Sequence, residues 1–95
     1  MRGYELMYII NPTLEEEAVN GVVEKFKTLV ETNGGEISKL DRWGKRRLAY
    51  EIDDLKEGHY VLCYFNGNPA VAHELDRVMK ITDEVIRHMI IRNEQ

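Results

Sequence analysis

The sequence has little of several features that would narrow its class at once. Its single cysteine, Cys63, excludes a disulfide within the chain, and no group of Cys and His has the spacing of a zinc site. We therefore expect a reducing compartment and no metal. Apolar runs are only a few residues long, and the first residues lead directly into a strand pattern, so we expect neither a membrane span nor a signal peptide.

The composition is typical of a small globular protein. The 95 residues are 43% hydrophobic and 32% charged, which is too apolar for a disordered chain and sufficient for one core. Repeats, low-complexity tracts and linkers are absent, so residues 1–95 are expected to form a single domain. The net charge of -4, taken as a whole-chain average, argues against nucleic-acid binding.

Hydrophobic periodicity predicts six elements in the order strand, helix, strand, strand, helix, strand. The predicted strands cover residues 4–10, 36–52, 59–66 and 85–92. The first helix is expected to begin with a capping box formed by Thr13 and Glu16 and to end near Gly34. Asn68 and Pro69 predict the start of the second helix.

The second strand pattern is unusually long, and its alternation slips at Gly44. A glycine inside a strand pattern indicates a bulge, so we expect one bent strand rather than two. Residues 53–58 are polar and end on Gly58, which predicts a hairpin loop into the third strand.

This order predicts an α+β fold of the ferredoxin-like type, a split βαβ sandwich (βαββαβ). Two right-handed crossovers and one hairpin give a four-stranded antiparallel sheet with two helices on one face and the first and third strands in the centre. The longer apolar row of the first strand, from Tyr4 to Ile10, is assigned to the core. The third strand is apolar in both rows, so its phase stays open.

Apolar residues on both faces of the strands predict a binding surface on the face without helices. A partner protein is the preferred occupant, although the edge of the long second strand could bind it instead. The alternative is an oligomer interface, or large residues partly covered by long charged side chains. The residues assigned to this surface are Met7, Ile9, Trp43, Tyr50, Tyr60, Leu62, Met89 and Ile91.

Positive charge is concentrated in one segment. Between residues 38 and 50, five basic residues and one acidic residue give +4, so the rest of the chain carries -8. Guanidinium groups beside aromatic rings suit phosphate pairing and base stacking, which predicts RNA binding despite the acidic total. The alternative is a solvated strand edge that resists aggregation.

A set of motifs along the whole chain resembles the bacterial small-subunit ribosomal protein six family. The most specific motif is the run Gly44-Lys45-Arg46-Arg47-Leu48-Ala49-Tyr50, and further matches lie in residues 4–9, 11–12, 51–52, 58–60 and 81–87. The resemblance implies a structural protein of the cytoplasmic ribosome, with no catalysis, cofactor or small-molecule substrate. It also implies binding to the central domain of small-subunit ribosomal RNA, as a heterodimer with ribosomal protein eighteen.

Six basic residues are candidates for RNA contact. By resemblance, Arg2, Arg46, Arg47 and Arg87 match basic positions of the family. Lys45 and Arg42 are added only because of their place in the basic segment.

Two other functions stay open on the sequence alone. An RNA recognition motif has the same topology, although His59 stands where its third strand would carry an aromatic residue. A small enzyme would need His59, His73 or His88 as a general base, yet none of them lies in a catalytic motif.

Overall fold

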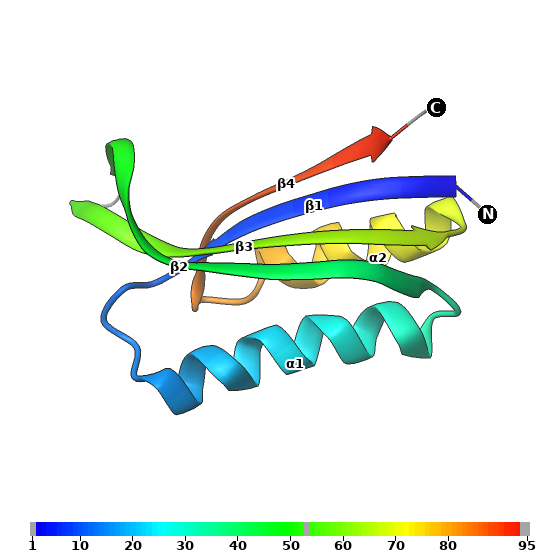
Figure 1. The fold of residues 1–95 in the computed structure, drawn as a ribbon, viewed down its shortest axis with the longest axis horizontal. Helices are drawn as coiled ribbons and strands as arrows, with labels where there is room; N and C mark the ends of the chain where they lie inside the picture. The colour runs from blue at the N-terminus through cyan, green and yellow to red at the C-terminus, as the bar shows by residue number, and fades with distance from the viewer. Residues whose placement is uncertain (1, 53, 94–95) are drawn as a thin grey trace.

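The helices and strands follow the predicted order (Figure 1). This computed structural model describes residues 2–52 and 54–93. The strands are β1 (Arg2–Ile10), β2 (Glu36–Ile52), β3 (Leu55–Gly67) and β4 (Val85–Asn93), and the helices are α1 (Glu16–Thr32) and α2 (Pro69–Lys80). Among the described residues, no helix is long and apolar enough to cross a membrane.

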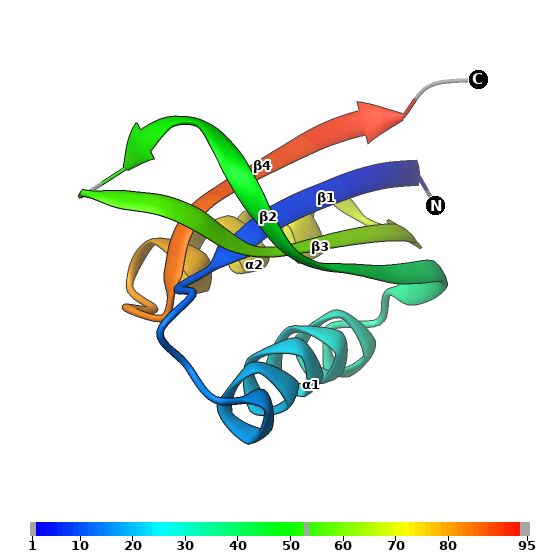
Figure 2. The same ribbon diagram turned by 60° about the vertical axis from the view of Figure 1, so that its left-hand side comes forward.

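The strands form one antiparallel sheet in the order β2-β3-β1-β4. Both helices pack against the same face of this sheet, and the other face carries no helix (Figure 2). The prediction of a ferredoxin-like sandwich with β1 and β3 in the centre is therefore confirmed.

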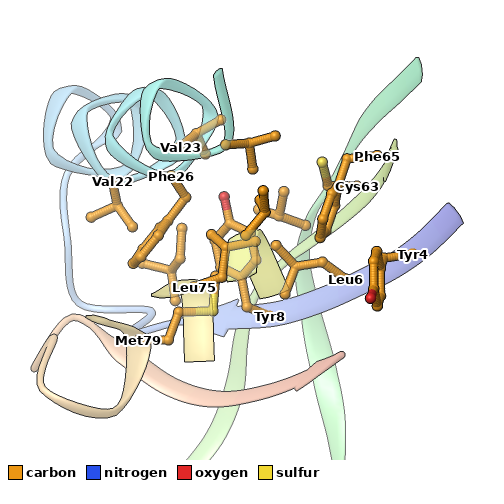
Figure 3. Close-up of a cluster of buried hydrophobic side chains, with 14 of the residues drawn as sticks. Tyr4, Leu6, Tyr8, Val22, Val23, Phe26, Cys63, Phe65, Leu75 and Met79 are labelled. Atoms are coloured by element: carbon orange, nitrogen blue, oxygen red, sulfur yellow. The ribbon is translucent and has the colours of Figure 1, made fainter. Parts of the chain in front are cut away.

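The core lies between the sheet and the helices (Figure 3). Alternate residues of β1 from Tyr4 to Ile10 are buried there, as predicted, and β3 adds Val61, Cys63 and Phe65. The odd-numbered residues of β3 therefore face the helices, which settles the phase that the sequence left open. Tyr8 packs edge-on against Phe26 of α1 with ring centroids 5.5 Å apart.

The start of α1 differs from the prediction. The helix begins at Glu16 with Glu15 at the N-cap position, and no side chain caps it. Thr13 instead donates from its backbone N and its Oγ1 to Oδ1 of Asn11, at 2.9 and 2.8 Å. The predicted capping box is wrong because the N-cap position falls at Glu15, which leaves Thr13 in the turn formed with Asn11 before the helix.

The bulge in β2 is confirmed. Gly44 has φ +77°, and the pairing with β3 shifts register between Arg42 and Gly44. A second irregularity lies between Arg47 and Ile52, where β2 has several residues that pair with no residue of β3.

The hairpin between β2 and β3 is shorter than predicted. Leu55 pairs with Ile52, and the pairing continues through Glu57 and Gly58, so the expected loop over residues 53–58 is wrong; residue 53 itself lies outside the described residues. The polar residues resemble a loop in sequence, yet a strand at a solvent-exposed hairpin tolerates them. Gly58 is buried in the strand, and the position requires glycine because a Cβ there would lie 2.3 Å from Cγ2 of Ile9.

The start of α2 agrees with the sequence. Asn68 occupies the N-cap position and Pro69 the first turn, although the Asn68 side chain makes no capping bond. Val71, Leu75 and Met79 form the buried stripe of the helix.

Candidate functional site

The sheet face without helices, here called the open face, is built from rows of residues that share a side of the sheet. Directly paired residues of antiparallel strands point to the same side. The rows run from β3 through β1 to β4, and they are Tyr60–Ile9–Arg87, Leu62–Met7–Met89 and Tyr64–Glu5–Ile91. Each row combines residues far apart in the sequence.

One end of the open face is covered by β2 itself. Residues 48–51, here called the β2 arch, leave the pairing with β3 and curl over the open face (Figure 2). The arch and the sheet enclose a cavity of about 200 Å³, which is lined by Ile9 and Tyr60 from the sheet and by Leu48 and Tyr50 from the arch. Ile9 is 3% exposed and Leu48 is 8% exposed. The arch is therefore packed onto the sheet through apolar contacts.

Two arginines at this arch end lie over aromatic rings. The guanidinium carbon of Arg46 is 5.7 Å from the Trp43 ring centroid, and its Nε donates to the Trp43 carbonyl at 3.3 Å. Arg87 on β4 lies 5.6 Å from the Tyr50 ring centroid and donates to the Tyr50 hydroxyl. Cations at such distances are attracted to the ring face.

Trp43 is held in turn by the sheet. Its ring stacks on Tyr60 of β3, with centroids 6.4 Å apart and planes at 11°. The bulge at Gly44 directly follows Trp43 and redirects the strand. Cationic and aromatic groups from β2, β3 and β4 thus meet at one end of the open face.

The predicted RNA-contact residues do not all gather there. Arg46 pairs with Gly58 and points to the open face, as Arg87 does, so these two occupy the arch end. Lys45 and Arg47 flank Arg46 and are exposed, but they pair with His59 and Glu57 and point to the other side of β2. Arg2 lies at the opposite end of β1, where it pairs with Gly67.

Arg42 points to the helix side of the sheet. Its Nη2 forms an ion pair with Glu16 of α1 at 2.9 Å, and its Nη1 donates to Asn20. This contact ties β2 to α1, and it places Arg42 away from the arch end.

All eight residues assigned to a partner surface face the open side, but they are not equally available. Among them Trp43, Tyr50, Met89 and Ile91 are 47%, 60%, 42% and 45% exposed. Ile9 is buried beneath the arch, so its side chain is not accessible to a partner protein. Sequence reasoning did not assign Leu48, which lines the same cavity as Ile9, although the alternating pattern of β2 already counted Leu48 among its apolar residues.

The far end of the open face is more polar. The Tyr64 hydroxyl donates to Oε1 of Glu5 at 3.2 Å, and Lys39 lies 3.4 Å from Asp41. Burial and the neighbouring Glu5 carboxylate raise the pKa of Tyr64, so this phenol stays neutral at physiological pH.

His73 and His88 line one cavity together with Asp76. His88 contacts Asp76 at 2.8 Å, and the same carboxylate binds Lys80 at 2.8 Å. The hydrogen bonds from Lys80 and His88 lower the pKa of Asp76, which makes it a stable anion of an ion-pair network. Within residues 2–52 and 54–93, no three His, Cys, Asp or Glu side chains are placed to hold a metal ion.

Comparison with known proteins decides the family. The family model for ribosomal protein S6 matches residues 3–92. The chain belongs to the ribosomal protein S6 family. The small ribosomal subunit protein bS6 of Desulforamulus reducens is 63% identical over 92 residues, which is 97% of each chain. That of Moorella thermoacetica is 53% identical over 95 residues, covering 100% of this chain and 97% of the relative.

Solved structures agree with this S6 assignment. The crystal structure of 30S ribosomal protein S6 from Thermotoga maritima has a TM-score of 0.93 at 38% identity, covering 97% of this chain and 87% of that one. The C-terminal domain of the MgtC protein from Mycobacterium tuberculosis, at 13% identity and a TM-score of 0.68, shares the fold alone.

Membership in the S6 family makes this chain a structural protein of the small ribosomal subunit, in the cytoplasmic ribosome. The expectation that it is not an enzyme is confirmed, and the histidine-base alternative is wrong. The matching family is that of ribosomal protein S6 rather than the RNA recognition motif.

Proposed function

We propose that this chain binds the central domain of small-subunit ribosomal RNA through the arch end of the open face, together with ribosomal protein eighteen. The observation that carries the proposal is the meeting of Arg46 and Arg87, from different strands, over the exposed rings of Trp43 and Tyr50. Lys45 and Arg47 add positive charge on the other side of the same exposed stretch of β2.

Guanidinium groups favour phosphate because their planar fork of N–H donors matches two phosphate oxygens at once. Such contacts fix the position of RNA without reading its bases, and they release counterions. Arg42 is left out of the proposed contacts because both of its η nitrogens are already bonded to α1. Arg2 stays a candidate for a separate contact at the other end of β1.

The middle of the open face supports a protein partner. The row Leu62–Met7–Met89 is apolar, and Met89 and Ile91 near the edge of the sheet are well exposed. Apolar side chains grouped on an open sheet gain free energy when a partner removes them from water. A basic partner also complements the acidic remainder of the chain.

RNA binding is tested with a central-domain RNA fragment, the full chain and purified protein eighteen, by fluorescence anisotropy. Arg46→Ala with Arg47→Ala should weaken binding at least about tenfold, since hydrogen bonds to charged groups contribute about 1.5–3 kcal/mol each. Arg77→Ala with Lys80→Ala is the matched control, because it removes the same charge from α2 on the helix side. Equal losses in both double variants would contradict the proposal.

The partner surface is tested by capturing protein eighteen on the immobilised chain. Met89→Lys should reduce capture, because it places a charge in the apolar row of the open face. Ile81→Lys is the control, since Ile81 is 69% exposed after α2 and lies outside that row. Full capture by the Met89→Lys variant would exclude the open face as the partner surface.

A further inference from the structure

We infer that Trp43 and Tyr50 are positioning residues, which hold the guanidinium groups of Arg46 and Arg87 in place for RNA phosphate. The inference rests on the proposed function of the arch end. The sequence alone predicts that these two rings contact a partner protein, so positioning the arginines is a different role.

The first pair is built into the bulge of β2. Trp43 stacks on Tyr60, which fixes the plane of the indole against the sheet. The guanidinium group of Arg46 lies over that indole, and its Nε donates a hydrogen bond to the Trp43 carbonyl. The ring and the carbonyl thus restrain a side chain that is otherwise long and mobile in solvent.

The second pair joins two strands. Tyr50 is carried by the β2 arch, which is anchored on the sheet by Leu48 and Ile9. Arg87 projects from β4 onto the Tyr50 ring and hydroxyl. The arch therefore supplies the ring, and the edge strand supplies the cation.

Both arginines keep most of their donors available in this arrangement. A guanidinium group has five N–H donors, and the contacts above use one nitrogen of Arg46 and one of Arg87. Arg42, in contrast, is bonded through both η nitrogens to α1. The contacts at the arch end thus leave the Nη1–Nη2 edge of Arg46 and the Nε–Nη2 edge of Arg87 available for phosphate.

Preorganisation has a measurable consequence. A ligand that meets an already ordered side chain avoids part of the entropy cost of fixing it. Cation–ring contacts at exposed sites contribute about 0.5–1 kcal/mol, so removing one ring should weaken RNA binding about two- to fivefold. The effect should exist only while the corresponding arginine is present.

A double-mutant cycle on Tyr50 and Arg87 tests this with the complex of the full chain, protein eighteen and the central-domain RNA fragment. We expect Tyr50→Leu to weaken binding about two- to fivefold, and Tyr50→Phe, which keeps the ring but lacks the hydroxyl that Arg87 contacts, to recover part of that loss. In the Arg87→Gln background, Tyr50→Leu should cause no further loss. The cycle of Trp43→Leu and Trp43→Phe with Arg46→Gln is expected to behave in the same way.

The outcomes separate the inference from the proposed function. If Arg46→Gln and Arg87→Gln both leave RNA affinity unchanged, the proposed function of the arch end is wrong. If they weaken binding but the ring variants have the same effect with and without their arginine, the rings act on RNA or on the fold directly and the positioning role is wrong.

A spectroscopic measurement on the free chain checks the same point without RNA. The Nε–Hε signals of Arg46 and Arg87 should show restricted motion, and Tyr50→Leu should mobilise Arg87 while leaving Arg46 unchanged. Equal mobility of Arg87 in the wild type and in Tyr50→Leu would overturn the inference.

Discussion

The bulge at Gly44 gives the sharpest prediction about how this fold directs the arch end. Gly44 has φ +77°, and apart from Gly44 and its two chain neighbours no atom of the described residues lies within 4 Å of the position that a Cβ would take. Gly44→Ala therefore creates no clash, and its whole cost is conformational. A left-handed conformation costs an L-residue about 1–2 kcal/mol. Alanine also restricts the unfolded chain, which offsets part of that cost, so we expect a loss of about 1 kcal/mol.

Two further variants separate the effect of the positive φ from the general effect of replacing a glycine. Gly44→Asn should lose less, because asparagine tolerates the left-handed region better than other non-glycine residues. Gly21→Ala in the middle of α1 also meets open space, but its backbone is helical, so it should stabilise the protein by about 0.5–1 kcal/mol.

The assay is urea unfolding followed by circular dichroism, with the free energy of unfolding compared among the wild type and the three variants. The slope with denaturant should stay constant, because none of the changes alters the surface exposed on unfolding. A Gly44→Ala variant as stable as the wild type would show that residue 44 is not held at positive φ, and the reasoning about the bulge would be refuted.

Three further predictions concern the packing and ionisation of other residues. Gly58→Ala should destabilise by about 1–3 kcal/mol in urea unfolding, because its Cβ would meet Ile9 at 2.3 Å, and a wild-type midpoint would contradict that packing. Burial raises the pKa of Cys63 to about 11, so alkylation at pH 8 should be about 100-fold slower than for an ordinary thiol; fast labelling without unfolding would disprove its burial. Hydrogen bonds from Lys80 and His88 lower the pKa of Asp76 below 3.8. The stability difference between wild type and Asp76→Asn should therefore be present at pH 7 and vanish as the pH falls below the lowered pKa, whereas a difference independent of pH would contradict the ion pairs.

Local patterns were enough to predict the order of the elements, the core face of β1 and the bulge at Gly44. Each of these depends on a signal within a few residues, such as alternation, a glycine or a proline. The phase of β3 was not predictable because Tyr60 to Phe65 is apolar in both rows. Only the packing of α1 and α2 against one face decided it.

Two predictions about local structure failed, the capping box of α1 and the loop between β2 and β3. Thr13 had the right spacing for a capping box, but the helix begins later, with Glu15 at the N-cap, and Thr13 bonds Asn11 in the preceding turn. The segment from Leu55 to Gly58 is polar like a loop, yet it pairs with β2. The residue types alone predict neither the start of the helix nor this strand pairing.

The sequence predicted which residue types form the candidate site, but not how they are arranged in space. The sequence indicated arginines for RNA and aromatic residues for a protein partner as two separate groups. The structure interleaves them, because the β2 arch leaves β3 and carries Tyr50 to Arg87. Arg42 was grouped with the basic segment, and its ion pair with Glu16 depends on a helix that is distant in sequence.

The central claim is that the arch end binds RNA phosphate, and the salt dependence of RNA affinity tests it most directly. The affinity of the chain with protein eighteen for the central-domain fragment is measured over a salt titration, for the wild type, Arg46→Ala with Arg47→Ala, and the control Arg77→Ala with Lys80→Ala. Each lost phosphate contact should reduce the slope of log affinity against log salt by about 0.7–0.9. We predict a shallower slope for the Arg46 and Arg47 variant and an unchanged slope for the control. The same slope in all three proteins would contradict the claim.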